Sequence, residues 1–412
     1  MSGPAHASTP TTSYLRAAAG MRALAGWYTW APCRWYEPWV WFDLCHTGSF
    51  QPSGGWWNSA NSLTTMVNFT LLSHDPTYVG LIHHAFDSRD DQASISTKWV
   101  DDDGWWALAW IGAAEMDARD PARSARELAR AEYVFRDMDQ YWDATCGGGV
   151  WWQKSPKHYK NAIANELYMA VAARLFQLTR DPIYLTRARA EYRWFFERSE
   201  MYERGRLIVD GIEDGTCGPS GPALIPATYT YNQGVILGAL VALQQAAGAA
   251  GDAVDPEDPA GPCAGHDLLR CAEEIADVAI RTLTVDGILT EDGSAGGSEM
   301  PGKDNRRPHG VHRKGRTASL TDCLGPDCPQ FKGIFMRNLG TLTRALPASE
   351  SQPYAEFLRR NADSIWQRDR ADAEGKVFFG VYWQGPFGFS NATVQTSALD
   401  ALVETMPLDG AP

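Results

Sequence analysis

The sequence is short of several features that would place it in a familiar class. Its 412 residues contain no apolar run of about 18 residues, so no transmembrane helix is predicted. Positive charge is scarce, because 37 lysines and arginines face 50 acidic residues and leave a formal net charge of −13. This balance argues against a nucleic acid or an anionic membrane as the main partner.

Common catalytic motifs are also missing. The sequence holds no GxSxG, HExxH, GxGxxG or GxxxxGK(S/T), and its nine histidines show no metal-ligand spacing. The glycine-rich stretch "CGGGVWW" (146–152) is not followed by a lysine-bearing helix start, so it is a weak candidate for a nucleotide loop. We therefore expect neither a metal nor a cofactor.

No secretory signal is visible, because "MSGPAHASTPTT" has no basic region followed by an apolar stretch. Two features nevertheless favour export: an even number of cysteines without metal spacing, and glycosylation sequons at Asn68 and Asn391. We expect a secreted or cell-wall protein whose signal peptide is not in this chain; a cytosolic protein with reduced thiols is the alternative. The end "ALVETMPLDGAP" has no apolar tail and so predicts no membrane anchor. The cysteines are residues 33, 45, 146, 217, 263, 271, 323 and 328.

Helical periodicity dominates the chain, and two Asp-Pro pairs, at Asp120 and Asp181, are typical of helix starts. Helix pairs that alternate with glycine-rich loops suggest a closed toroid of hairpins, and twelve helices would fill one all-α (α/α)6 barrel. We expect a disordered N-terminus over 1–11 and a single barrel domain over 12–406, acting as a monomer. The helices are predicted at 12–26, 58–72, 76–88, 104–118, 121–142, 159–179, 182–200, 229–249, 264–283, 331–346, 353–370 and 391–405.

One segment, 284–330, stands apart as a long irregular insertion. It is rich in glycine and proline and carries six basic residues. We expect a solvated surface loop; the alternative is a rim element that touches an anionic group such as a phosphate. The basic residues are Lys303, Arg306, Arg307, Arg313, Lys314 and Arg316.

Tryptophan is concentrated at the front of the chain. Of 17 tryptophans, 14 lie in the first 152 residues, and three adjacent pairs occur near expected helix starts, at 56–57, 105–106 and 151–152. Core packing explains any single tryptophan. Three pairs at the loop-to-helix junctions of a toroid would also suit the apolar faces of a sugar ring, and Trp57 and Trp152 are candidates for that role.

Three consecutive acids, in "KWVDDDGWWALAW" (98–110), precede one of these pairs. One or two of them are explained as an N-cap and a first-turn acid of the helix that follows. Glycoside hydrolysis offers a second explanation, because it needs one ionised carboxylate and one carboxyl that keeps its proton. Adjacent aspartates in an aromatic setting would differ in pKa, since the charge of one opposes the charge of the other.

These residues are similar to a known family. "WVDDDGWWALAWI" resembles the Asp-Asp motif of glycoside hydrolase family 76, the endo-α-1,6-mannanases, which reads roughly Tyr-Asp-Asp-x-Gly-Trp-Trp-Ala-Leu-Ala-Trp. The resemblance continues, in the family's order, through "CGGGVWWQKSPKHYKNAIANELYMAVAARLF" (146–176), "VDGI" (209–212), "TYTYNQGVILGAL" (228–240) and "FKGIFMRNL" (331–339). It implies an (α/α)6 barrel with a cleft at one end, and retention of anomeric configuration.

By position, the resemblance makes Asp101 the nucleophile and Asp102 the acid/base, and leaves Asp103 to start the helix. Substrate-binding candidates from the neighbouring motifs are Trp105, Asp210, Tyr231, Asn232, Gln233, Asn161, Asn165 and Lys332. Each has an ordinary explanation as well: the two asparagines at 161 and 165 can satisfy buried backbone, and the lysine can cap a helix.

Three hypotheses follow from the sequence. The first is a retaining hydrolase that cuts internal α-1,6 linkages of mannan. The second keeps the fold and the aspartate pair but acts as a transglycosylase, or as a hydrolase of cell-wall or glycolipid-anchor α-mannosides or a related α-glycan. The third is a non-catalytic carbohydrate-binding protein, against which the intact aspartate pair argues. The expected partner is α-mannan or another mannose-containing saccharide.

Overall fold

The computed structural model describes twelve α-helices and nine short strands. It covers residues 11–30, 33–37, 40–45, 49–50, 56–88, 97–218, 221–251, 263, 267–291 and 327–409. The helices are α1 (Thr12–Ala25), α2 (Trp56–Ser73), α3 (Val79–Asp87), α4 (Val100–Met116), α5 (Pro121–Asp139), α6 (Ala162–Thr179), α7 (Pro182–Glu197), α8 (Thr230–Ala250), α9 (Leu268–Thr282), α10 (Phe331–Ala345), α11 (Ala348–Arg368) and α12 (Ala392–Val403).

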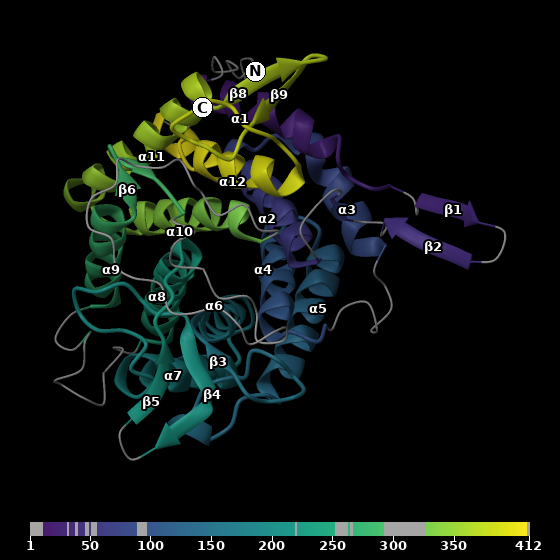
Figure 1. Ribbon diagram of the computed structural model, residues 1–412. Coiled ribbons are helices and arrows are strands. Elements are labelled where there is room, and N and C mark those ends of the chain that lie inside the picture. The colour runs from purple at the N-terminus through teal and green to yellow at the C-terminus, as the bar shows by residue number, and fades with distance from the viewer. Residues whose placement is uncertain are drawn as a thin grey trace, which may run out of the picture.

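The helices form two concentric rings (Figure 1). Each even-numbered helix packs on the next, and α12 returns to α2, so that the inner ring is closed. The odd-numbered helices lie outside, where α5 covers α4, α7 covers α6 and α9 covers α8. Inner and outer helices alternate along the chain, which confirms the prediction of an all-α (α/α)6 barrel.

The helices of the two rings differ in how many of their residues are buried. The inner helix α6 buries 14 of its 18 residues, whereas the outer helix α7 buries 8 of 16. An inner helix touches neighbours on every side and is therefore apolar all round, while an outer helix needs only one apolar stripe. The long apolar helix α8, which could cross a membrane by length and composition alone, is one of these inner helices and is mostly buried.

Close helix contacts explain some glycines of the motifs. A Cβ atom on Gly104 of α4 would lie 2.8 Å from the Cβ atom of Leu167 on α6. A Cβ atom on Gly234 of α8 would lie 2.5 Å from the Cα atom of Phe335 on α10. Glycine therefore lets neighbouring inner helices approach each other closely near the end where their chains enter the ring.

Several helix boundaries differ from the prediction. Asp120 and Asp181 cap α5 and α7 as expected, but α4 begins at Val100 rather than at residue 104. The helix expected from 159 begins at Ala162, because the residues before it pair as a strand. The helix α11 begins five residues before Pro353 and contains it; a proline this near a helix start removes only one intrahelical hydrogen bond.

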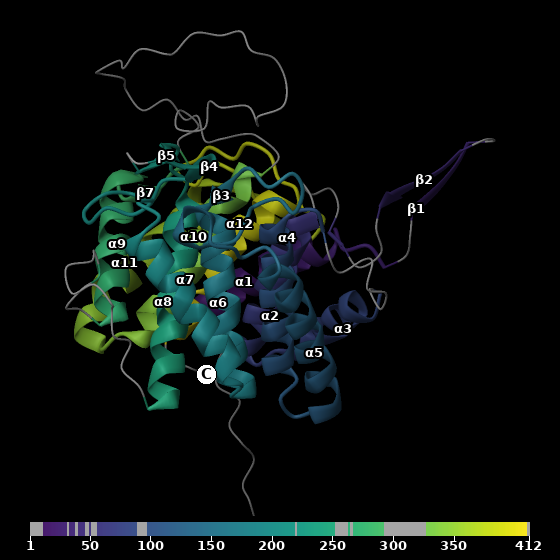
Figure 2. The ribbon, with the colours of Figure 1, turned by 90° about the horizontal axis from the view of Figure 1, so that it is seen from below.

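The strands, which the helical periodicity did not reveal, form small antiparallel sheets. Figure 2 shows the three-stranded sheet β3–β4–β5 and the hairpin strand β7 at one end of the helices. We call this end the upper mouth of the barrel. The strands are β1 (Cys33–Glu37), β2 (Val40–Cys45), β3 (Lys160–Asn161), β4 (Gly211–Gly218), β5 (Gly221–Ile225), β6 (Thr284–Val285), β7 (Ile288–Leu289), β8 (Arg370–Ala373) and β9 (Lys376–Phe379).

Two disulfides join described residues, and both fit the expectation of oxidised cysteines. Cys146 is bonded to Cys217 on β4, and Cys263 to Cys271 on α9. Of the two sequons, Asn391 uses its side chain to cap α12, and Asn68 lies on α2. The basic cluster 303–316 lies outside the described residues.

Candidate active site

The three consecutive aspartates lie in the first turn of α4, at the upper mouth. The N-cap of α4 is Trp99, which makes no side-chain cap bond, so no aspartate serves as the N-cap. This corrects the expectation that the acids precede the helix. Their position still favours negative charge, because the free backbone N–H groups and the dipole of the helix lie there.

Asp103 is the structural member of the three. Its Oδ1 accepts a hydrogen bond from the backbone N–H of Thr97 at 2.7 Å, and its Oδ2 lies 2.5 Å from Nζ of Lys154. The same ammonium group reaches Oδ2 of Asp137 on α5 at 2.5 Å. Asp103 therefore ties the chain entering α4 to the outer ring, from within the first turn of a helix that begins three residues earlier, at Val100.

Asp101 and Asp102 have different surroundings. Oδ2 of Asp101 accepts a hydrogen bond from the indole N–H of Trp152 at 2.9 Å. Burial raises the pKa of Asp101 to about 7, against the opposing effect of this indole bond. Burial, together with the charges of Asp101, Asp103 and Asp327, raises the pKa of Asp102 well above its usual range. The pKa of both carboxyl groups is therefore raised, and more neighbouring negative charge acts on Asp102 than on Asp101.

Asp210, which directly precedes β4, is held in place by the β3–β4 pairing. Its Oδ2 accepts from the hydroxyl of Tyr159, and its Oδ1 accepts from the amide of Asn232 at 3.2 Å. Its backbone carbonyl accepts from the N–H of Ala162 at 2.7 Å, so the first residue of α6 fixes it. A Cβ atom on Gly211 would lie 2.6 Å from the carbonyl oxygen of Lys160, so only glycine permits this strand contact. Burial raises the pKa of Asp210 despite its two donors.

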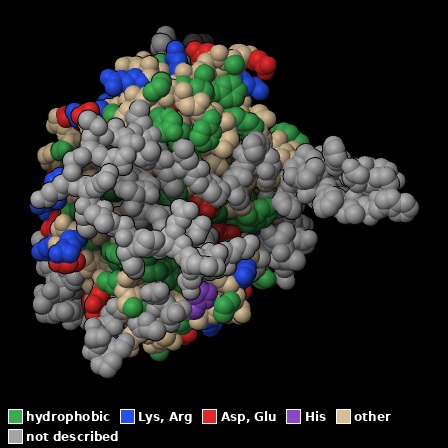
Figure 3. Space-filling model, in the orientation of Figure 1, with side chains coloured by type: hydrophobic (Ala, Val, Ile, Leu, Met, Phe, Trp, Pro, Cys, Tyr) green, Lys and Arg blue, Asp and Glu red, His purple; other side chains and the backbone are tan. Residues whose placement is uncertain are grey.

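Aromatic side chains line the same mouth. Trp57, at the start of α2, stacks on Trp105 with ring centroids 5.8 Å apart, and its indole N–H donates to Asp327 at 2.9 Å. Tyr231, on α8, stacks on Phe331 at 4.0 Å. In Figure 3, acidic and hydrophobic side chains reach the surface side by side near the centre of this face. The site therefore combines carboxyl groups with flat apolar surfaces.

The third tryptophan pair has a divided role. Trp152 packs against Trp99 with ring centroids 4.4 Å apart and donates to Asp101, whereas the indole of Trp151 donates to Asp143 at 2.7 Å, away from the aspartate pair. Trp105 and Trp106, in contrast, are both buried. Trp152 is thus the member of this third pair that reaches the site.

Four of the predicted binding residues have other partners. Gln233 bonds the backbone of Ile208 in both directions, and Asn165 does the same with Val150, so neither amide is left for a sugar. Asn161 caps α6. Buried Lys332 donates to the carbonyl of Val381 at 2.9 Å, next to the ring of Trp383. The ordinary explanations of these residues are therefore the ones that the contacts support, with Lys332 as a buried donor instead of a cap.

Sequence reasoning missed three residues near the site. Tyr159 and Asp327 make the contacts given above, and Glu166 on α6 is fully buried with no hydrogen-bond partner for either carboxyl oxygen among the described residues. Burial, together with the charge of Asp210, raises the pKa of Glu166 well above its usual range. Tyr159 and Glu166 lie inside the quoted stretch 146–176, but a residue type alone does not reveal its partner.

One group of side chains outside the mouth has the composition of a metal site. His83, Asp117 and Glu127 bring ligand atoms within 4.8 Å of one another. However, Nε of Arg123 lies 3.1 Å from Glu127 and 3.7 Å from Asp117. The guanidinium group already supplies the positive charge that these carboxylates require, so we interpret the group as an ion-pair network that joins α3 to α5.

A closed double ring of helices with paired carboxyl groups and tryptophans at one mouth is an arrangement that fits an (α/α)6-barrel glycoside hydrolase. Residues 44–253, about half of the chain, match the model of glycosyl hydrolase family 76. The chain belongs to this family and is a glycoside hydrolase.

Relatives agree with this assignment. The mannan endo-1,6-alpha-mannosidase DCW1 of Saccharomyces cerevisiae is 25% identical over 387 residues, which are 88% of this chain and 74% of that protein. The fold is shared with the α-1,6-mannanase GH76A of Salegentibacter sp. HEL1_6, with a TM-score of 0.70 and 18% identity over 96% of this chain and 99% of that chain. That structure is of an inactive variant in complex with α-1,6-mannotriose, and two consecutive aspartates are replaced by asparagine in it. It is also shared with Dfg5 of Chaetomium thermophilum in complex with glucosamine (TM-score 0.71, 19% identity, 99% and 94%).

Proposed function

We propose that this chain is a retaining endo-α-1,6-mannosidase in which Asp101 is the nucleophile and Asp102 the general acid/base. The carrying observation is the unequal environment of two adjacent carboxyl groups. Asp101 is stabilised as an anion by the indole N–H of Trp152, whereas Asp102 keeps a proton among three other acids. Double displacement needs this combination of one anion and one acid.

In the first step, Asp102 gives its proton to the glycosidic oxygen while Asp101 attacks the anomeric carbon. The bond to the leaving sugar breaks, and an ester forms between Asp101 and the remaining saccharide. In the second step, Asp102, now an anion, takes a proton from water as the water oxygen displaces Asp101. The configuration at the anomeric carbon is inverted twice and so retained.

The names of the relatives and the composition of the mouth support mannan as the substrate. Asp210 and Asn232 offer a carboxylate and an amide that suit sugar hydroxyls. Trp57, Tyr231 and Trp152 offer flat apolar faces. Trp105, which is 3% exposed, supports Trp57 from below.

Loss of either catalytic carboxyl group should abolish turnover without unfolding the barrel. Asp101→Asn and Asp102→Asn are compared with Asp363→Asn, a surface change on α11, by reducing-sugar release from α-1,6-mannan and by thermal unfolding. We expect activity to fall by 10³-fold or more only in the first two variants. Near-normal activity of the Asp101 or Asp102 variant would contradict the mechanism.

Rescue of activity by azide distinguishes the nucleophile from the acid/base. With an aryl α-1,6-mannobioside, Asp101→Ala should be rescued by azide to give the β-glycosyl azide, because azide enters from the side where the carboxylate stood. Asp102→Ala should give the α-azide, because azide then attacks the ester on Asp101. The opposite pattern would exchange the two assignments.

Product analysis distinguishes hydrolysis from transglycosylation, the other reaction open to the same ester. Incubation of α-1,6-mannan with a labelled mannobiose acceptor should release reducing ends and leave the label in mannobiose. Label in longer chains would favour a transglycosylase.

The disulfides Cys146–Cys217 and Cys263–Cys271 support a secreted or cell-wall location, and we propose residues 12–406 as the catalytic unit.

A further inference from the structure

A cavity occupies the lumen of the inner ring below the aspartates. Its volume is about 310 Å³, and residues of α2, α4, α6, α8 and α10 line it. On α4 the lining begins with Trp105 and ends with Glu115, and on α6 it runs from Ala170 to Gln177. These are the later turns of helices whose first turns carry the upper mouth. We call this cavity the lower lumen.

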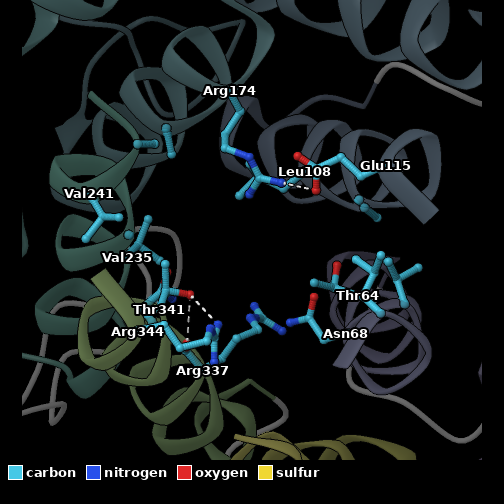
Figure 4. Close-up of a pocket in the computed structure, with 18 of the residues that line it drawn as sticks. Thr64, Asn68, Leu108, Glu115, Arg174, Val235, Val241, Arg337, Thr341 and Arg344 are labelled. Carbon is cyan, nitrogen blue, oxygen red and sulfur yellow. Dashed lines mark hydrogen bonds and ion pairs between the residues drawn. The ribbon is translucent and has the colours of Figure 1, made fainter. Parts of the chain in front are cut away.

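The lower lumen carries charged and polar side chains beside a larger apolar surface, and it is in contact with solvent. Arg174 on α6 faces Arg337 and Arg344 on α10 across it (Figure 4). The side chains of Arg174 and Glu115 are each 30% exposed, and that of Arg344 is 34% exposed. The cavity volume lies at the lower end of the range for ligand pockets, about 300 to 1,000 Å³.

The charges of the lower lumen balance. Arg174 pairs with Glu115 at 2.7 Å, Arg337 pairs with Asp400 at 3.2 Å, and Arg344 pairs with Glu404. Each of the three guanidinium groups in the wall is thus paired with a carboxyl group, although Asp400 and Glu404 are buried behind the wall and do not line the cavity, so an added anion finds no unpaired cation. A neutral ligand fits this wall best.

Several polar groups in the wall keep unused hydrogen-bonding capacity. Among the described residues, Arg174 bonds only through Nη2, the amide of Asn68 has no hydrogen-bond partner, and Nε2 of Gln245 donates to none. Apolar surface lies beside them on Trp105 and Val235. Hydroxyl groups both donate and accept, so a neutral polyhydroxy ligand can use this mixture of donors, acceptors and apolar wall.

We propose that the lower lumen is a second binding site, which takes a neutral saccharide of one or two sugar units. Trp105 forms the boundary between the two sites, because it stacks on Trp57 of the upper mouth and also lines the lower lumen. The choice of α-1,6-mannobiose as the first probe rests on the proposed function. D-mannose and D-glucose are titrated as well, so that the test does not depend on the linkage that the enzyme cuts.

The experiment counts sites in a chain that cannot turn the probe over. In Asp101→Asn/Asp102→Asn, calorimetric titration with mannobiose should give two sites per chain. Adding Arg174→Met or Gln245→Leu should weaken one site by tenfold or more and leave the other unchanged. Gln245 is exposed, so its variant keeps the test available if the arginine variant does not fold, which thermal unfolding checks.

Arg270→Met is the control, because Arg270 lies on the outer helix α9, does not line the lumen and has a side chain that is 58% exposed. It should preserve both sites. A single site, or two sites that ignore both lumen substitutions, would overturn the proposal, as would displacement of the sugar by inorganic phosphate at equal concentration. Failure of the enzyme to cut α-1,6-mannan would refute the proposed function alone.

Discussion

Asp101 and Asp102 must differ in protonation at one pH for a double displacement to proceed. Because burial raises the pKa of Asp101 to about 7, this group becomes an anion only as the pH rises through neutrality. We expect kcat/KM on α-1,6-mannan oligomers to fall on the acid side near pH 7 and to fall again at higher pH, when Asp102 loses its proton. An acid limb near pH 4, as for an ordinary aspartate, would contradict this assignment.

The leaving group provides the control for the alkaline limb. The aryl group of an aryl mannobioside leaves without receiving a proton from the enzyme. For this substrate, the alkaline limb of the glycosylation step should therefore disappear, while the acid limb stays. Stopped-flow release of the phenol at a series of pH values measures both limbs. Two identical profiles for mannan oligomers and aryl substrate would remove Asp102 from the acid role.

Glu166 predicts a pH dependence of stability. Its pKa is raised in the folded chain, so its proton is bound more tightly there than in the unfolded chain, and this advantage is lost as the pH rises through the folded pKa. We expect Glu166→Gln to remove a loss of up to about 1.4 kcal/mol per pH unit above the unfolded pKa. Urea unfolding between pH 5 and 8 should therefore show a flatter curve for the variant.

The control for this measurement is Glu356→Gln, a change at an exposed glutamate on α11. Its unfolding free energy should follow the pH dependence of the unaltered chain. Parallel curves for Glu166→Gln and the unaltered chain would mean that Glu166 is ionised in the folded barrel, and would refute the prediction.

At the scale of residues, the sequence predicts which side chains are suited to the reaction better than it predicts what each side chain contacts in the fold. The family resemblance led to Asp101 and Asp102, and the tryptophan pairs led to Trp152, whose indole the structure places on Asp101. Gln233 and Asn165 were equally good candidates by residue type. An amide, however, bonds backbone as readily as sugar, and only the fold shows that buried backbone takes both of its ends.

At the scale of elements, the loop before β3 is held by one buried side chain, that of Lys160. The ammonium group of buried Lys160 donates to Asp143 and to the carbonyls of Thr145, Gly148 and Gly149 at 2.7 to 3.0 Å. We expect Lys160→Met to lower the free energy of unfolding by about 2 to 4 kcal/mol, since several buried acceptors lose their donor. The KM for mannan should also rise, because this loop carries Trp152.

Lys157→Met is the matched control, because Lys157 belongs to the same loop and lies 4.0 Å from the same Asp143 carboxylate, but is 40% exposed. It should change unfolding by less than about 1 kcal/mol. Chemical denaturation and mannan kinetics of both variants test the prediction. Equal effects of the two substitutions would show that burial of Lys160 is not what holds the loop.

Element boundaries show where local sequence signals end. Proline after an N-cap acid correctly placed the starts of α5 and α7, because both residues act locally. The predicted start of α4 was four residues too late. Trp99, the N-cap, makes no side-chain cap bond, and three consecutive aspartates are typical of a loop before a helix. The short strands at the mouth depend on pairing between distant segments, and so they carry no periodic signal.

At the scale of the whole molecule, the helix count and the family resemblance were sufficient to predict the ring, but not how it closes. Closure joins the last inner helix to the first through buried polar contacts. Thr65 on α2 donates to Asp400 on α12 at 2.6 Å, and Ser62 lies 2.7 Å from the hydroxyl of Thr396. These residues are more than 330 positions apart in sequence, so no local pattern announces their pairing.

Arg337 on α10 completes this closure, and its loss gives the largest expected effect on stability. It pairs with Asp400 at 3.2 Å and also bonds Asn61 on α2. We expect Arg337→Met to cost about 3 to 5 kcal/mol, because it leaves Asp400 buried without its cation. The double variant Arg337→Met/Asp400→Leu should recover part of that loss, since no charge stays unpaired.

Arg206→Met is the control, because it breaks a pair with Glu203 in which the arginine is 73% exposed. It should change the free energy of unfolding by less than about 1 kcal/mol. Chemical denaturation of the three variants measures these differences, and a double variant no more stable than Arg337→Met would show that packing, rather than charge, closes the ring.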